Sequence, residues 1–156
     1  MASGRRRCEF LALDDPFSYR SLLTLPKYIV NATGDQYFVP DSSQFYFDDL
    51  EGESHLRYLP NTGHSIDDTD ALEGALGFYQ FILAGHPRPE YAWRYDDDGV
   101  LVLTTPQEPV AVRHWQATNP RARDFRYPVL GAAFTAQPID RNEAGEFRGV
   151  VAPPPA

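Results

Sequence analysis

Two residues whose side chains can do acid–base chemistry each follow a predicted β-strand. Asp35 comes shortly after the apolar run Tyr28–Ala32, and His64 comes shortly after the run His55–Leu59. Because the carboxyl ends of parallel strands meet at one edge of a sheet, a carboxylate and an imidazole placed there can form a hydrogen bond. Such a carboxylate fixes the imidazole tautomer and stabilises the imidazolium, as a serine hydrolase requires. The pattern therefore predicts Asp35 as the catalytic acid and His64 as the general base.

Each of these residues also has a purely structural interpretation. An Asp that follows Gly at a strand end is often only a turn former, and a single His before a helix is weak evidence of function. Asp41 is a second carboxylate in the same region, and its position is more typical of the N-cap of a helix that runs to Leu50. The order of acid loop, histidine loop and helix favours Asp35 and His64 as a pair, with Asp41 as the alternative acid.

Strand-like and helix-like segments alternate over residues 15–85. The clearest helix is predicted from about Thr69 to Leu83, where apolar residues recur at helical spacing. They are Leu72, Ala75, Leu76, Tyr79, Ile82 and Leu83. The order strand, helix, strand, helix predicts an α/β unit with a parallel sheet and covering helices.

The apolar period changes to two after a proline-containing linker at residues 86–90. Tyr91–Tyr95 and Val100–Thr105 flank the turn sequence Asp-Asp-Asp-Gly, which is typical of a β-hairpin. Val110–Thr118 and Tyr127–Ala136 are predicted as two further strands. Residues 91–149 are therefore expected to form a small all-β, sandwich-like module.

Composition excludes several classes of partner. The net charge is −8 over 156 residues, which argues against binding to nucleic acid or to anionic membranes. No apolar run approaches the roughly 20 residues that span a bilayer, so no membrane span is predicted. The histidines share no metal-ligand spacing, and neither a metal nor a cofactor is expected.

The two ends of the chain carry little structural signal. Cys8 is the single cysteine, so no internal disulfide forms. The beginning, MASGRRRC, is basic like a signal peptide, but its apolar part runs only from Phe10 to Leu13 and is too short for export. We interpret residues 1–14 as a poorly ordered leader and the Pro-rich residues 150–156 as a disordered tail.

Several motifs in order resemble those of one protein family. They are DPFSYR from residue 15, LPK from residue 25, VNATGDQYFVPDSSQFYFDDLEGESHLRYLPNTGHS from residue 30, HWQATNP from residue 114 and RDFR from residue 123. This combination resembles the PhoPQ-activated pathogenicity-related protein family, which also takes in autocrine proliferation repressor-like proteins.

The resemblance implies the C-terminal portion of an α/β-hydrolase-like fold with an added β domain, in a secreted or cell-envelope protein. It also implies that Asp35 is the triad acid and His64 the triad base, and that full-length relatives cleave a small ester or peptide substrate.

A nucleophile is the missing third member of this site. An α/β hydrolase presents its serine on a G-x-S-x-G elbow that precedes the acid and the histidine. None of the seven serines lies in that pattern; they are Ser3, Ser18, Ser21, Ser42, Ser43, Ser54 and Ser65. We therefore expect a truncated, hydrolase-like chain that is inactive alone, because an acid and a base have nothing to activate. The alternative is a non-catalytic secreted signalling or binding protein built on the same scaffold.

Overall fold

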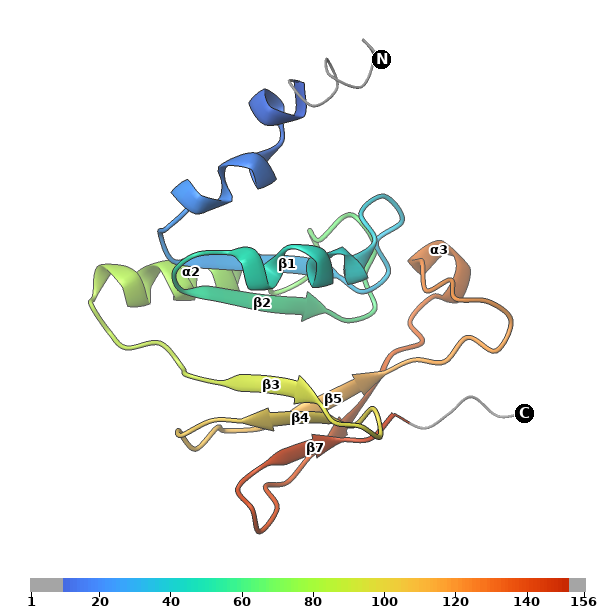
Figure 1. The fold of residues 1–156 in the computed structure, drawn as a ribbon. Helices are drawn as coiled ribbons and strands as arrows, with labels where there is room; N and C mark the ends of the chain where they lie inside the picture. Colours follow the sequence, from blue (N-terminus) through green and yellow to red (C-terminus); the bar gives the residue numbers. More distant parts are fainter. Residues whose placement is uncertain (1–9, 152–156) are drawn as a thin grey trace.

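The structure is a computed structural model that describes residues 10–151 (Figure 1). The predicted leader and tail therefore lie largely outside the described residues. Residues 10–14 are helical, and the short 3₁₀ helix η1 (Pro16–Leu22) follows them. The Asp15 carboxylate begins η1 by accepting a hydrogen bond of 3.0 Å from the Phe17 N–H. These helical segments project away from the rest of the chain (Figure 1).

Strands β1 (Lys27–Ala32) and β2 (Ser54–Leu59) form a parallel pair, as predicted. Their register runs from Lys27 opposite Ser54 to Ala32 opposite Leu59, so both strands end at the same level. Helix α2 (Ala71–Leu83) confirms the predicted helix and packs on this pair. The predicted apolar stripe does not face the pair, because all of its residues except the half-buried Ile82 are exposed. The rings of Tyr28 and Phe78 stack there with their centroids 5.3 Å apart.

The connection between β1 and β2 differs from the predicted helix. It contains two 3₁₀ helices, η2 (Pro40–Phe45) and η3 (Phe47–Asp49), instead of one helix that runs from Asp41 to Leu50. Pro40 occupies the start of η2, and Asp41 lies inside its first turn without serving as the N-cap. Proline fits this position because its backbone has no N–H to leave unpaired.

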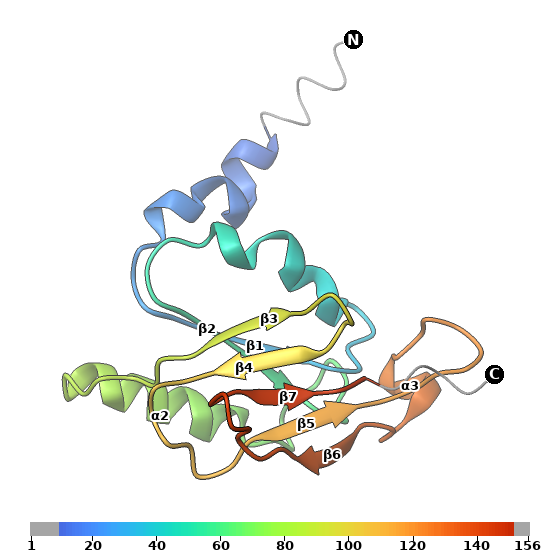
Figure 2. The ribbon, with the colours of Figure 1, turned by 60° about the horizontal axis from the view of Figure 1, so that its bottom comes forward.

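The remaining strands are antiparallel and belong to two small sheets (Figure 2). In the first, β4 (Leu101–Thr104) lies between β3 (Ala92–Tyr95) and β7 (Phe147–Gly149); in the second, β5 (Arg113–Gln116) pairs with β6 (Thr135–Pro138). The predicted hairpin between β3 and β4 is confirmed.

The expected fold class is wrong. An α/β-hydrolase-like parallel sheet followed by a β-sandwich-like module would continue β1 and β2 into further parallel strands. Within residues 10–151 no other strand pairs with β1 or β2, and the chain leaves α2 to enter antiparallel strands. The described architecture is a set of three separate small sheets, of which only the two-stranded one is parallel.

The predicted strand Tyr127–Ala136 is also wrong. Its first part is the short helix α3 (Tyr127–Leu130), and the strand β6 begins only at Thr135. Pro128 suits the first turn of a helix, and Gly131, with φ of 62°, ends that helix in a left-handed conformation that favours glycine. Strand β7 was not predicted; its Phe147 is buried and lies opposite Leu103 of β4, while the neighbouring Val102 of β4 is fully buried.

No helix among residues 10–151 combines the length and the apolar character needed to cross a bilayer.

Candidate functional site

The ends of β1 and β2 bring Asp35 and His64 into contact. Ala32 and Leu59 are partners at the ends of the two strands, and the turns that follow them carry the two side chains. The Nδ1 atom of His64 lies 3.1 Å from Oδ2 of Asp35. The structure thus joins the two residues that the sequence singled out, at the edge where parallel strand ends converge.

Asp35 is held by its own turn. Its Oδ1 atom accepts hydrogen bonds from the backbone N–H groups of Tyr37 and Phe38, at 2.8 and 2.9 Å. The residue is 8% exposed, and this burial raises its pKa. The two backbone hydrogen bonds and the hydrogen bond and charge of His64 outweigh burial, so the pKa of Asp35 lies below its usual value. Asp35 is therefore a fixed carboxylate anion at neutral pH.

His64 has one engaged and one open ring nitrogen. Nδ1 faces Asp35, whereas no residue from 10 to 151 forms a hydrogen bond with Nε2. The rings of Tyr37 and Phe38 lie beside the imidazole, with centroids 4.9 and 5.3 Å from it. The side chain of Gln36 holds the backbone, since its Oε1 atom accepts a hydrogen bond of 3.1 Å from the His64 N–H. No pattern in the sequence predicts this role of Gln36.

None of the serines in the described residues forms a hydrogen bond with His64. Ser43 shares a hydrogen bond of 2.6 Å with the Tyr58 hydroxyl, and Ser65 donates to Asp67 at 2.8 Å. Ser18 and Ser54 donate to backbone carbonyls. Ser3 lies outside the described residues. The arrangement in residues 10–151 therefore contains a carboxylate–imidazole contact, but no serine hydroxyl is bonded to that imidazole.

Asp41, the alternative acid, lies in a different interaction. Its Oδ2 atom forms an ion pair with Nη2 of Arg123 at 2.5 Å, on an exposed part of the surface. The geometry therefore brings Asp35, rather than Asp41, to the imidazole of His64.

A second carboxylate–imidazole contact occurs at the opposite end of β2, and the sequence analysis missed it. Oε1 of Glu53 lies 2.6 Å from Nε2 of His55, and both guanidinium nitrogens Nε and Nη2 of Arg88 bind the same carboxylate. The Arg88 hydrogen bonds, helped by His55 and opposed by burial, lower the pKa of Glu53 to about 2. The sequence pattern that could have predicted this contact is the spacing of Glu53 and His55, because residues two positions apart lie on one face of an extended segment.

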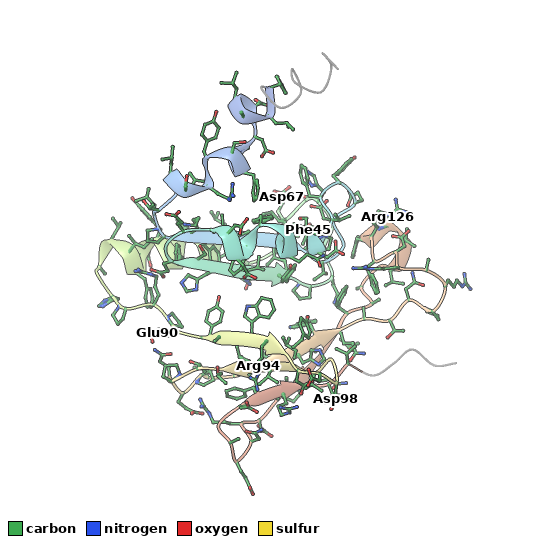
Figure 3. The ribbon with its side chains drawn as sticks, viewed as in Figure 1. Phe45, Asp67, Glu90, Arg94, Asp98 and Arg126 are labelled. Atoms are coloured by element: carbon green, nitrogen blue, oxygen red, sulfur yellow. The ribbon has the colours of Figure 1, made fainter. Side chains whose placement is uncertain are left out.

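This second cluster lines an open cleft of about 760 Å³ between β2 and the chain that leads into β3. Tyr91 contributes a hydroxyl 3.3 Å from Nδ1 of His55, and Phe47 and Trp93 add apolar walls. Burial raises the pKa of the Tyr91 hydroxyl. Figure 3 shows Glu90, also in the lining, at the end of β3 away from Asp98.

No cluster of three or more His, Cys, Asp or Glu side chains in the described part of the chain is arranged to hold a metal ion.

Comparison with known proteins identifies the family. The family model described as PhoPQ-activated pathogenicity-related protein matches residues 1–126. Autocrine proliferation repressor protein A of Dictyostelium discoideum is 36% identical over 138 residues, which cover 80% of this chain and 28% of that protein. This chain thus spans less than a third of the length of that curated relative. No solved structure matches the chain. The family model and the relative together show that the chain belongs to the PhoPQ-activated pathogenicity-related protein family.

Proposed function

We propose that Asp35 and His64 are the acid and the general base of a site that cleaves a small ester or a peptide. The observation that carries this proposal is the oriented imidazole: Nδ1 is 3.1 Å from Asp35 and Nε2 has no hydrogen-bond partner in the described residues. With its proton on Nδ1, the imidazole presents a lone pair at Nε2. That nitrogen takes the proton of an attacking hydroxyl while the hydroxyl oxygen bonds to the substrate carbonyl carbon.

Asp35 contributes to this reaction through its charge and its fixed position. The carboxylate stays ionised because backbone N–H groups and His64 lower its pKa. It therefore stabilises the imidazolium that forms when Nε2 takes the proton. The two backbone hydrogen bonds to Oδ1 prevent the carboxylate from rotating away from the ring.

The nucleophile, in this proposal, belongs to polypeptide that this chain does not include. The support is twofold: no serine in residues 10–151 is bonded to His64, and the Dictyostelium relative is far longer than the part that this chain matches. The chain alone is then inactive as an acyl-transfer enzyme, because the base has no positioned hydroxyl to activate. A fluorophosphonate probe is expected to leave all of its serines unlabelled.

Supplying the missing hydroxyl as a small alcohol tests the acid–base pair directly. The purified chain is mixed with p-nitrophenyl acetate and trifluoroethanol, and formation of the trifluoroethyl ester is followed with release of p-nitrophenolate. Nε2 takes the alcohol proton, the alcohol oxygen bonds to the acetyl carbon, and the bond to p-nitrophenolate breaks. We expect His64→Gln to lower the protein-dependent rate about tenfold or more, since general base catalysis at a positioned group contributes at least that much.

His86→Gln is the matched control. His86 packs against Phe81 and has no carboxylate partner among the described residues. Its substitution is expected to leave the alcoholysis rate unchanged. Equal rates for the wild type, His64→Gln and His86→Gln would show that the Asp35–His64 contact has no base activity.

The name of the relative favours a second candidate function. Autocrine proliferation repressor protein A is named for a signalling role, so a non-catalytic signalling or binding protein that is secreted or lies in the cell envelope is the second proposal. The test adds the purified chain to growing Dictyostelium cells and counts them. Repression by the wild type and equally by an Asp35→Asn, His64→Gln double variant supports this second function. Repression that the double variant loses supports the first.

A further inference from the structure

Asn61 links the turn before His64 to a segment far along the chain. Its Nδ2 atom donates a hydrogen bond to the carbonyl of Phe134, and the Phe134 N–H donates to its Oδ1 atom, both at 2.8 Å. The backbone of Asn61 has φ of 58°, in the left-handed region that asparagine tolerates better than most residues. The side-chain amide thus binds the Phe134 backbone as a neighbouring strand would.

The turn that carries Asp35 makes a matching contact with the same segment. The Tyr127 N–H donates a hydrogen bond of 2.8 Å to the carbonyl of Gly34, the residue next to Asp35. The approach is close enough that a Cβ atom on Gly34 would lie 2.8 Å from both the Cβ and the N atom of Tyr127. Only glycine permits this contact without displacing Tyr127.

The two turns are also bonded to each other. The Asn61 N–H donates to Oγ1 of Thr33 at 3.0 Å, and the Gly34 N–H donates to the carbonyl of Thr62 at 2.9 Å. Residues 126–134, which include α3, therefore contact both members of a bonded pair of turns. Figure 3 labels Arg126, which leads into α3, on the side of the molecule where β1 and β2 end.

We propose that residues 126–134 form a positioning clamp that holds Asp35 and His64 in contact, with Asn61 and Tyr127 as its positioning residues. The inference rests on the proposed function, because it concerns control of the same acid–base pair. The clamp belongs to the connection between β5 and β6, so the antiparallel part of the chain fixes the geometry of a pair carried by the parallel strands. Displacing this connection releases His64 from Asp35.

The variant Asn61→Gly tests the clamp. Glycine keeps the left-handed backbone and removes the two side-chain hydrogen bonds. The readout is the tautomer of the neutral His64 ring, measured from its ¹⁵N shifts in the whole chain without any substrate. We expect the Nδ1–H tautomer to dominate in the wild type, and the fraction of the Nε2–H tautomer to rise about threefold or more in Asn61→Gly, as expected when two hydrogen bonds are lost.

Asn142→Gly is the matched control. The Oδ1 atom of Asn142 accepts a hydrogen bond of 2.8 Å from the Glu146 N–H in the turn before β7. The variant therefore loses a hydrogen bond from an asparagine side chain to the backbone at a place away from the clamp. We expect it to lower the thermal midpoint without changing the His64 tautomer. A tautomer shift as large in Asn142→Gly as in Asn61→Gly would overturn the clamp, because it would reflect general loosening of the chain.

Gly34→Ala tests the other contact of the clamp if Asn61→Gly does not fold. The new Cβ displaces Tyr127, so we expect faster hydrogen exchange at the Tyr127 N–H together with the same tautomer shift. Faster exchange with a wild-type tautomer ratio would overturn the proposal, since the clamp would then open without moving the pair. A wild-type His64 without any preferred tautomer would instead contradict the proposed function itself.

Discussion

The two strands of the parallel pair carry a carboxylate–imidazole contact at each end, and the two contacts differ in how their charges and nitrogens are used. At the carboxyl ends, Asp35 is bound by backbone N–H groups and by His64, and Nε2 of His64 has no hydrogen-bond partner among residues 10–151. At the amino end of β2, Glu53 is bound by Arg88 and His55, and the other nitrogen of His55 faces the Tyr91 hydroxyl.

The two contacts differ in whether the carboxylate also pairs with a guanidinium. A guanidinium neutralises Glu53, so its charge is already paired when His55 approaches. Among the described residues His64 is the only side chain that forms an ion pair with Asp35, whose other oxygen accepts the backbone N–H groups of Tyr37 and Phe38. An acid–base site needs a free nitrogen and an uncompensated carboxylate, whereas the paired cluster ties β2 to the chain entering β3. The contact of Asp35 with His64 thus supports the proposed acid–base role, whereas the contact of Glu53 with His55 belongs to an ion-paired cluster.

Asp35→Asn gives the largest effect that this comparison predicts. The amide keeps an acceptor for the backbone N–H groups but removes the charge that fixes and stabilises the His64 ring. We expect the His64-dependent alcoholysis rate to fall about tenfold or more, because an uncharged partner leaves the imidazole in the wrong tautomer. The free energy of unfolding, measured in urea, should change by no more than about 1 kcal/mol. A variant with full activity would show that the charge of Asp35 has no part in the reaction.

Glu53→Gln should show the opposite pattern. Loss of the charge weakens the hydrogen bonds from Arg88 and His55, and we expect the free energy of unfolding to fall by about 1–2 kcal/mol in urea. The alcoholysis rate should not change, because the cluster lies at the other end of β2. Glu143→Gln is the control, since no ion pair with Glu143 is found in residues 10–151, and it should leave unfolding unchanged. If Glu53→Gln had the same free energy of unfolding as the wild type, the Glu53 cluster would not stabilise the chain, and the proposed difference between the two contacts would be wrong.

Low pH should remove the contribution of the Glu53 carboxylate to the free energy of unfolding. Its pKa is about 2 in the folded chain against a usual value of 4.5, so the folded state binds fewer protons than the unfolded state over this interval. The stabilisation is complete above pH 4.5 and is lost as the pH falls toward 2. The difference in unfolding free energy between the wild type and Glu53→Gln should therefore narrow over that interval. A constant difference from neutral pH down to pH 2 would show that Glu53 is not the titrating group.

The sequence predicted the contact between Asp35 and His64 because both signals are local. Each strand-like run is followed within a few residues by a glycine and then by Asp35 or His64, and parallel pairing of adjacent strands then places the two side chains together. Helix α2 and the hairpin between β3 and β4 were predicted for the same reason, since each depends on periodicity and turn residues within one segment.

The errors concern contacts between distant segments. No local sequence pattern indicates how many strands pair with β1. The α/β-hydrolase-like sheet was therefore inferred from the order of the elements and from the family resemblance, and the structure shows a two-stranded parallel pair instead. Tyr127–Ala136 has the composition of a strand, yet Pro128 and Gly131 define a short helix within it. The bonds of Asn61 to Phe134 and of Glu53 to Arg88 join residues 73 and 35 positions apart, a separation that periodicity does not reach.

Asp41→Asn gives the smallest effect and decides between the two candidate acids. Asp41 is six residues beyond Asp35 and pairs with Arg123 on the exposed surface, so its charge is screened and already partnered. We expect neither the alcoholysis rate nor the His64 tautomer to change in this variant, while Asp35→Asn changes both. If Asp41→Asn lowered the rate and Asp35→Asn did not, the acid would be Asp41, and the turn between β1 and η2 would have to rearrange to bring Asp41 to His64. The paired measurement thus tests whether contact in the folded chain, rather than proximity in the sequence, selects the acid.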